Sequence, residues 1–157
     1  MTFETTIAAG LVAAAASLAA MPAQAGTAFS NMKSLNTTQC LDGDTHDDHH
    51  LQMWSCDSDD DEQWLAFRGA NGLDMLVNRR SGLCVTAPGG LGQAVTLTLC
   101  NSDAPNQLWS AVTGASPSHW QNIAIGYCLW AQNTQNRASL VLGNCGASDQ
   151  RLYWLKP

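Results

Sequence analysis

The sequence has few basic residues, since 7 lysines and arginines stand against 13 aspartates and glutamates in 157 residues. Proteins that bind nucleic acid present a basic face, so this balance argues against a nucleic-acid partner. It argues equally against anchoring on an anionic membrane surface. The apolar run at residues 7–20 is shorter than the roughly 20 residues that span a bilayer, so membrane insertion is not expected.

Several local patterns are also missing. After residue 25 no stretch has the periodicity of an amphipathic helix, and short alternating stretches are separated by glycine, asparagine and serine. No Gly-x-Ser-x-Gly stretch marks a serine nucleophile. No Cys-x-x-Cys pair marks a structural zinc site. These absences favour an all-β domain without catalysis, metal or cofactor.

Residues 1–25 are predicted to be a signal peptide. The apolar run ends in Ala23-Gln24-Ala25, an A-x-A cleavage pattern, so the mature chain would begin at Gly26. Glu4 disagrees, because signal peptides begin with positive charge; a lipid-facing anchor or a core helix remains the alternative. Without Glu4, 12 acidic residues face 7 basic ones, a net charge of −5.

Six cysteines and three tryptophans recur at a fixed period. The first cysteines lie 44 residues apart at 40, 84 and 128, the second ones at 56, 100 and 145, and tryptophans follow at 64, 109 and 154. Such a period indicates one supersecondary unit used three times. In an exported chain it predicts three disulfides, each closing a loop of about 15 residues worth about 3 kcal/mol. The pairs are Cys40–Cys56, Cys84–Cys100 and Cys128–Cys145.

Alternation before each second cysteine predicts a half-buried strand. Residues 95–99 read Val-Thr-Leu-Thr-Leu, and the same register in the first repeat places Leu51 and Met53 inside. Gln52 and Trp54 then share the outward face, although Trp54 could instead be a core residue. The recurring tryptophans at 64, 109 and 154 are predicted to be core. Gly82 is expected to supply the positive φ of a hairpin turn.

The repeated motifs resemble the ricin B-type lectin repeat. They are Cys40-Leu41-Asp42, Trp54-Ser55-Cys56 and Gln107-Leu108-Trp109, and the resemblance covers about residues 29–157. It implies a β-trefoil of twelve strands, built from repeats at about residues 29–70, 71–114 and 115–157. It also implies up to one shallow sugar site per repeat.

The resemblance carries five candidate sugar-binding residues onto the first repeat. They are Asp42, Gln52, Trp54, Asp61 and Glu62. The last two stand where the family has an Asn-Gln pair, and two carboxylates facing one site repel each other or share a proton. The equivalent positions 86, 96 and 98 of repeat 2 and 130, 141 and 143 of repeat 3 hold no carboxylate, so both sites are expected to be inactive.

Nine of the 13 acidic residues lie between Asp42 and Glu62, beside three histidines. Residues 57–61 open like a calcium loop, but Glu62 stands where an EF-hand needs glycine. Zinc could use the stretch at His46, Asp47, His49 and His50, although no spacing template is matched. Alternatively, these are two solvated loops that keep the protein soluble.

The sequence therefore predicts a secreted, extracellular lectin with one working site in repeat 1. Its partners would be glycans, galactose-type or related plant and cell-surface polysaccharides. Paired carboxylates can indicate a glycosidase, but a shallow site with no second domain argues against an enzyme. The alternative is a trefoil that has lost sugar binding and contacts a protein partner, as a protease inhibitor or a toxin-like adhesion subunit.

Overall fold

The computed structural model describes residues 28–44, 50–68, 71–112, 119–147 and 154. These residues form eleven β-strands and two single-turn 3-10 helices, so the predicted all-β class is confirmed. Among them, no helix is long and apolar enough to cross a membrane. The predicted signal peptide, residues 1–25, lies outside the described residues.

Three antiparallel hairpins repeat the same register. They are β2 with β3 (Gln39–Gly43, Leu51–Ser55), β6 with β7 (Cys84–Thr86, Thr96–Thr98) and β10 with β11 (Cys128–Ala131, Leu140–Gly143). In each hairpin the first cysteine lies opposite the residue two before the second cysteine: Cys40↔Trp54, Cys84↔Thr98 and Cys128↔Gly143. The alternation in the sequence therefore located these strands correctly.

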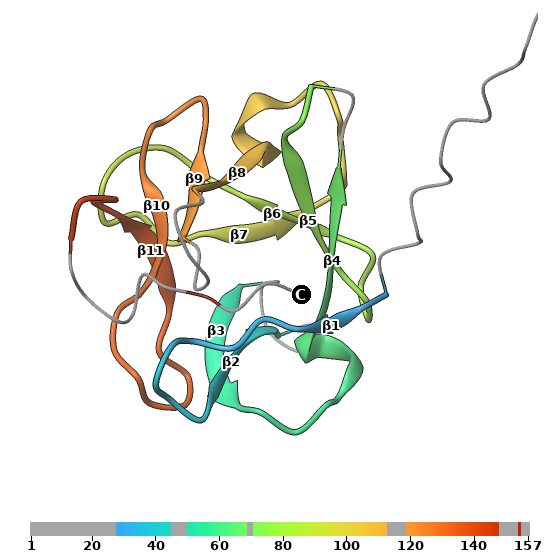
Figure 1. Ribbon diagram of the computed structural model, residues 1–157, viewed down its shortest axis with the longest axis vertical. Coiled ribbons are helices and arrows are strands. Elements are labelled where there is room, and N and C mark those ends of the chain that lie inside the picture. The colour runs from blue at the N-terminus through green and yellow to red at the C-terminus, as the bar shows by residue number, and fades with distance from the viewer. Residues whose placement is uncertain (1–27, 45–49, 69–70, 113–118, 148–153, 155–157) are drawn as a thin grey trace, which may run out of the picture.

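The remaining strands connect the hairpins. They are β1 (Ser30–Asn31), β4 (Gln63–Arg68), β5 (Asp74–Asn78), β8 (Trp109–Val112) and β9 (His119–Asn122). They pair in the order β1-β4-β5-β8-β9 (Figure 1), and an antiparallel bridge between Ser34 and Trp154 joins the first repeat to the third. Helices η1 (Asp60–Glu62) and η2 (Pro105–Gln107) lead into β4 and β8. The result is the predicted β-trefoil, with eleven strands among the described residues where the resemblance implied twelve.

The closing tryptophans hold the three units in the same way. Trp64, Trp109 and Trp154 are fully buried, as predicted. The indole Nε1 of each donates to a carbonyl just after the first cysteine of its own repeat, at 2.8, 3.0 and 3.2 Å. A buried indole needs such a partner, because an unpaired N–H in the core costs about 1–3 kcal/mol. The acceptors are the carbonyls of Leu41, Val85 and Leu129.

The three predicted disulfides are formed, with Cα–Cα distances of 5.0, 5.0 and 5.1 Å.

Glycines stand at one register position of repeats 2 and 3, two residues before the first cysteine of each repeat. They are Gly82 and Gly126, with φ of +66° and +80°. This confirms the turn predicted at Gly82. Thr38 is the register equivalent of these glycines in repeat 1, but the positive φ falls on Asn36 (+55°), and asparagine tolerates that conformation well.

Candidate functional site

A cavity of about 380 Å³ lies on the β2–β3 hairpin of the first repeat. It is lined by Asp42, Asp44, His50, Gln52, Trp54, Asp57, Asp59, Asp61 and Arg137. Four of the five residues predicted to bind sugar are therefore brought together: Asp42, Gln52, Trp54 and Asp61. The hairpin explains part of this grouping, because Asp42 and Gln52 are directly opposed across its ladder.

Asp42 and Gln52 form the floor of the pocket. Their side chains are 6% and 7% exposed, and Gln52 Nε2 donates to Asp42 Oδ1 at 2.8 Å. This bond fixes the orientation of the carboxylate. It also turns the amide nitrogen of Gln52, and not its carbonyl oxygen, toward Asp42. Gln52 is also bridged to Ser139 of repeat 3, so the floor rests on the neighbouring repeat.

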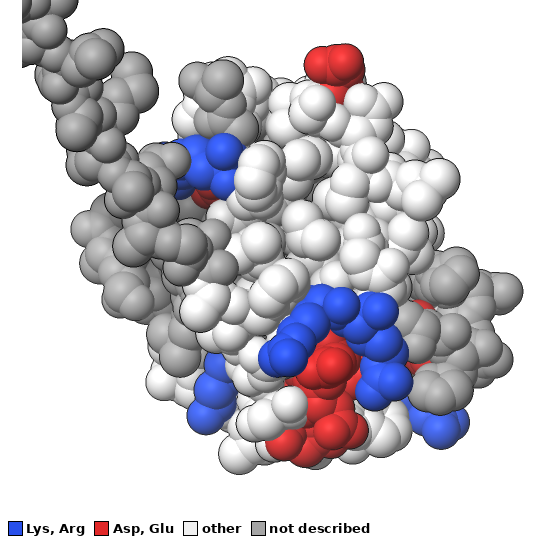
Figure 2. Space-filling model, turned by 90° about the vertical axis from the view of Figure 1, so that its right-hand side faces the viewer, with Lys and Arg blue, Asp and Glu red and all other residues white. Residues whose placement is uncertain are grey.

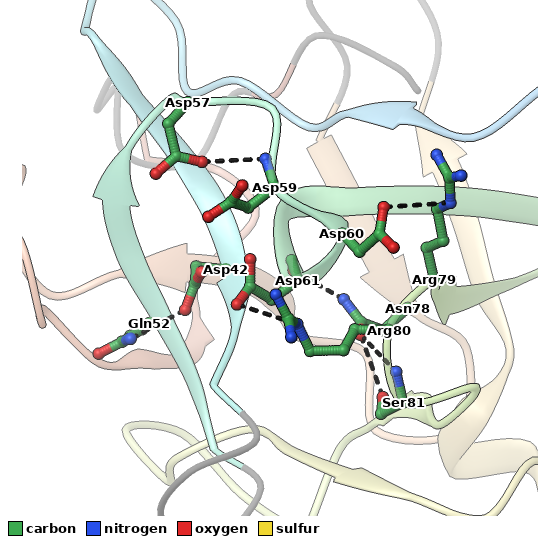
Figure 3. Close-up of polar contacts among 10 residues, drawn as sticks. All are labelled: Asp42, Gln52, Asp57, Asp59, Asp60, Asp61, Asn78, Arg79, Arg80 and Ser81. Atoms are coloured by element: carbon green, nitrogen blue, oxygen red, sulfur yellow. Dashed lines mark hydrogen bonds and ion pairs between the residues drawn. The ribbon is translucent and has the colours of Figure 1, made fainter.

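The Asp42 carboxyl group titrates above its ordinary range. Burial is the largest cause and the negative charges of Asp61, Asp44 and Asp57 add to it, so that the pKa of Asp42 is raised to about 6 even though the Gln52 hydrogen bond lowers it. Figure 3 shows the Asp42 and Asp61 carboxylates next to each other, with Asp59 and Asp57 beyond them. Near neutral pH the pocket is therefore a concentration of negative charge.

Trp54 lines the pocket and is half-buried, so it is not a core residue. The guanidinium of Arg137 lies 5.9 Å from the centre of a Trp54 ring, within the range of a cation–π contact. Arg137 was not among the residues predicted for the site. It belongs to a turn of repeat 3, where its backbone N–H donates to the Met53 carbonyl at 2.8 Å. Arg137 has a φ of +67°, a backbone conformation that sequence spacing does not predict for an arginine.

Asp61 and Glu62 are adjacent in sequence but have different environments. Asp61 faces the pocket, where its carboxylate pairs with Arg80 at 3.3 Å, and Asn78 Nδ2 donates to its carbonyl at 2.7 Å. Asp60, one residue earlier, pairs with Arg79 at 3.3 Å. Figure 2 shows an acidic patch bordered by basic side chains, in agreement with these pairs.

Glu62 is fully buried and does not line the pocket, which corrects its placement among the sugar-contacting groups. Its Oε2 accepts from the backbone N–H groups of Asp57 and Ser58, at 2.8 and 3.3 Å, and from Asn31 Nδ2 at 3.0 Å. The same register position in repeat 2 is Gln107, whose Oε1 accepts from the Asn101 N–H at 2.7 Å. Both residues serve the fold, because each accepts from a backbone N–H of the turn before it.

In repeat 2 the positions of Asp42 and Trp54 are held by two threonines, Thr86 and Thr98. Thr86 and Thr98 lie 2.7 Å apart between their Oγ1 atoms, and Gln107 Nε2 donates to both at 3.0 and 2.7 Å. These groups satisfy one another, and neither provides a ring or a carboxylate for a ligand.

The same positions in repeat 3 are arranged differently. The ring of Trp130, which replaces the aspartate, lies against Gly143, where any Cβ would collide with it. The indole therefore covers the place that the other repeats give to a side chain at this register. Counted from the first cysteines, the register places Asp149 and Gln150 at the positions of Asp61 and Glu62, and both lie outside the described residues.

A metal site was the other hypothesis for the acidic stretch. Within the described ranges, which leave out 45–49, no group of three or more His, Cys, Asp or Glu side chains could hold a metal ion. Four residues of the stretch, His46, Asp47, Asp48 and His49, lie in that gap. Asp44, His50, Asp57 and Asp59 do line the pocket, so the two acidic loops border one site.

Comparison with solved structures supports the fold. A designed threefold-symmetric protein, ThreeFoil, is 18% identical, covers 82% of this chain and 99% of its own, and has a TM-score of 0.71. The C-terminal half of an earthworm R-type lectin, solved with GalNAc, is 11% identical. The match covers 82% of this chain and 96% of the lectin chain, with a TM-score of 0.63. A mosquitocidal holotoxin gives 15% identity and a TM-score of 0.73 over 82% of this chain, but only 17% of its own.

No curated protein matches the chain in sequence. A family model does match, over residues 28–154, and it is the model of the ricin-type beta-trefoil lectin domain. That match spans all three hairpins and the pocket of repeat 1, in agreement with the repeated cysteines and tryptophans. The chain therefore belongs to the ricin-type β-trefoil lectin family.

Proposed function

We propose that this protein is a secreted lectin that binds glycans at one site, the pocket of repeat 1. The observation that supports this most directly is that Trp54 and Asp42 line the same cavity. A sugar presents an apolar C–H face and hydroxyl edges, so it needs a flat ring and a fixed acceptor. Trp54 offers the ring, and Asp42, oriented by Gln52, offers the acceptor.

Galactose-type or related glycans are the proposed ligands. The earthworm lectin of the same fold was solved with GalNAc, and the family is one of lectins. One stacked ring and a few hydrogen bonds in water gain about 1 kcal/mol each, so a single site binds modestly. Tight attachment to a surface would then need several copies of the glycan or of the protein.

Binding without catalysis is part of the proposal. The family is generally non-enzymatic, and each of the two pocket carboxylates, Asp42 and Asp61, is accounted for by an interaction within the protein. Asp61 is held in an ion pair with Arg80, and Asp42 is bonded to Gln52.

Secretion is proposed from residues 1–25, with cleavage after Ala25. Three disulfides favour an oxidising compartment, because thiols stay reduced in the cytosol. Intact-mass measurement of the exported protein should show a chain that begins at Gly26 and has all six cysteines oxidised. A mass that retains residues 1–25 would contradict the signal peptide.

A glycan array followed by calorimetry tests the lectin function. Trp54→Ala and Asp42→Ala should each abolish binding, since they remove the ring and the acceptor. The matched control is Thr98→Ala, which changes the position equivalent to Trp54 in repeat 2 and should bind normally. Binding that survives both repeat 1 substitutions would exclude this site, and an array without any hit would exclude the function.

A second candidate is a trefoil that acts through protein contacts. Arg137 already lies over the Trp54 ring, and the corresponding positions of repeats 2 and 3 are filled, which favours weak sugar binding. A toxin, the mosquitocidal holotoxin, contains the same fold. Capture of a partner that free sugars do not displace, together with an empty glycan array, would support this candidate over the first.

A further inference from the structure

The pocket of repeat 1 carries more negative charge than recognition of a neutral sugar needs. Five carboxylates line it, and the one guanidinium among its lining residues is that of Arg137. Hydroxyl groups need one or two fixed acceptors, whereas each further carboxylate loses hydration when an uncharged ligand covers it. The five are Asp42, Asp44, Asp57, Asp59 and Asp61.

Three of these five carboxylates have no basic partner among the described residues. Among the described residues, Asp61 pairs with Arg80, but Asp42, Asp57 and Asp59 have no ion pair with a lysine or an arginine. The Asp59 backbone N–H donates to Asp57 Oδ1 at 3.0 Å, and this turn sets both side chains on the wall of the pocket (Figure 3).

One cation of the protein itself already lies beside the Trp54 ring. The Arg137 guanidinium lies 5.9 Å from the Trp54 ring centre, and its backbone is held to Met53, not to the carboxylates. The aromatic ring and the surrounding acids thus favour a positive group over the ring face. A ligand that brings its own positive charge would meet both the ring and the uncompensated carboxylates.

We propose, building on the lectin function above, that this pocket selects saccharides that carry a free, protonated amine. A glucosamine- or galactosamine-type residue would stack its C–H face on Trp54 and direct its ammonium toward Asp42, Asp57 and Asp59. An ammonium group has three donors and no acceptor, which matches a wall of carboxylates. N-acetylation removes the charge and two of these donors, so the acetylated sugar is the weaker ligand.

Calorimetry on the mature chain with two oligosaccharides of equal length tests this. One is made of glucosamine residues and the other of N-acetylglucosamine residues. The amine form should bind at least about tenfold tighter at low ionic strength, and its advantage should shrink as salt shortens the range of charge interactions. A lysine-rich peptide of similar charge serves as a third ligand, and it should bind more weakly because it has no ring to stack on Trp54.

The matched variants use the pseudo-symmetry of the fold. Asp57→Asn is tolerated by the turn, because Asn101 of repeat 2 accepts from the Asp103 N–H at 2.9 Å in the same way. Combined with Asp59→Asn, it should remove most of the preference for the amine. Asp103→Asn, the equivalent of Asp59→Asn, removes one charge from the same turn of repeat 2, outside the pocket, and should preserve the preference.

Equal or tighter binding of the acetylated oligosaccharide would overturn the inference while the lectin function stands. So would a preference that the Asp57→Asn, Asp59→Asn double variant retains, or a lysine-rich peptide that binds as tightly as the amine sugar. If neither oligosaccharide nor any glycan on the array binds, the lectin function itself fails, and this inference fails with it.

Discussion

Replacing Glu62 by glutamine is expected to stabilise the protein at neutral pH. Glu62 is fully buried, and while its Oε2 accepts three hydrogen bonds, its Oε1 is buried with no hydrogen-bond partner among the described residues. An acceptor left in this state costs about 1–3 kcal/mol. The carboxyl group can reduce that cost by holding a proton and donating it.

Repeat 2 has a donor at the position that Oε1 takes in repeat 1. There the residue is Gln107, whose Nε2 carries two N–H groups and lies within hydrogen-bond distance of three oxygens, those of Thr86, Thr98 and the Leu99 carbonyl, at 3.0, 2.7 and 2.9 Å. By register the Leu99 carbonyl becomes that of Ser55 in repeat 1. The position thus calls for a donor, which glutamine supplies at every pH and glutamate supplies only when protonated.

The pH dependence follows from this geometry. Burial raises the pKa of Glu62 above its ordinary value of 4.5, and the charges of Asp57 and Asp42 raise it further, while the backbone hydrogen bonds of Asp57 and Ser58 lower it. The folded state then binds more protons than the unfolded chain, so stability falls as pH rises above about 4.5. Glu62→Gln removes this loss, so its benefit should be small at pH 4.5 and full above the folded-state pKa.

Urea unfolding at pH 4.5, 6 and 8, with the disulfides intact, measures the effect. We expect Glu62→Gln to add about 1–3 kcal/mol at pH 8, equivalent to roughly 3–10 °C in melting temperature for a domain of this size. The reverse change, Gln107→Glu, should destabilise repeat 2 by a similar amount with the same pH trend. A gain that is equal at all three pH values, or no gain at pH 8, would refute the protonated-donor argument.

Three further outcomes are expected. Glycan binding should weaken as pH falls through about 6, because Asp42 then gains a proton and can no longer accept as a carboxylate. Calorimetry at pH 5 and pH 7 measures this change in affinity. Asp42→Asn should abolish the pH dependence. Trp64→Phe should cost about 1–3 kcal/mol in urea unfolding, because the Leu41 carbonyl loses its buried donor; a cost near zero would contradict that role. Replacing Cys84 and Cys100 together by serine should lower the free energy of unfolding by about 3 kcal/mol, because the unfolded chain is no longer constrained by a closed loop of about 15 residues.

The scaffold was predictable because its determinants repeat. Spacing alone identified the disulfides, and it assigned Trp64 and its two equivalents to the core, where all three indoles donate to equivalent carbonyls. Alternation along β3 separated Leu51 and Met53, which are fully buried, from Trp54, which lines the pocket. Such patterns are local and appear three times, so chance agreement is small.

The site was harder to predict because parts of it do not repeat. Asp61 and Glu62 are neighbours in a single helical turn, and spacing could not show that one faces the pocket while the other is buried. Arg137 comes from another repeat, and its position depends on a backbone contact with Met53. Sequence register describes each repeat by itself, whereas this pocket is formed where two repeats meet.

The bridge between Ser34 and Trp154 places the end of repeat 3 beside the start of repeat 1. Each disulfide stays within one repeat, so no covalent link fixes which repeat comes first in the chain. A circular permutant that begins with repeat 2 would therefore keep every disulfide and every tryptophan–carbonyl bond. It would also join repeats 3 and 1 directly, so that Arg137 and Trp54, now far apart in sequence, would belong to one continuous segment that encodes the whole pocket.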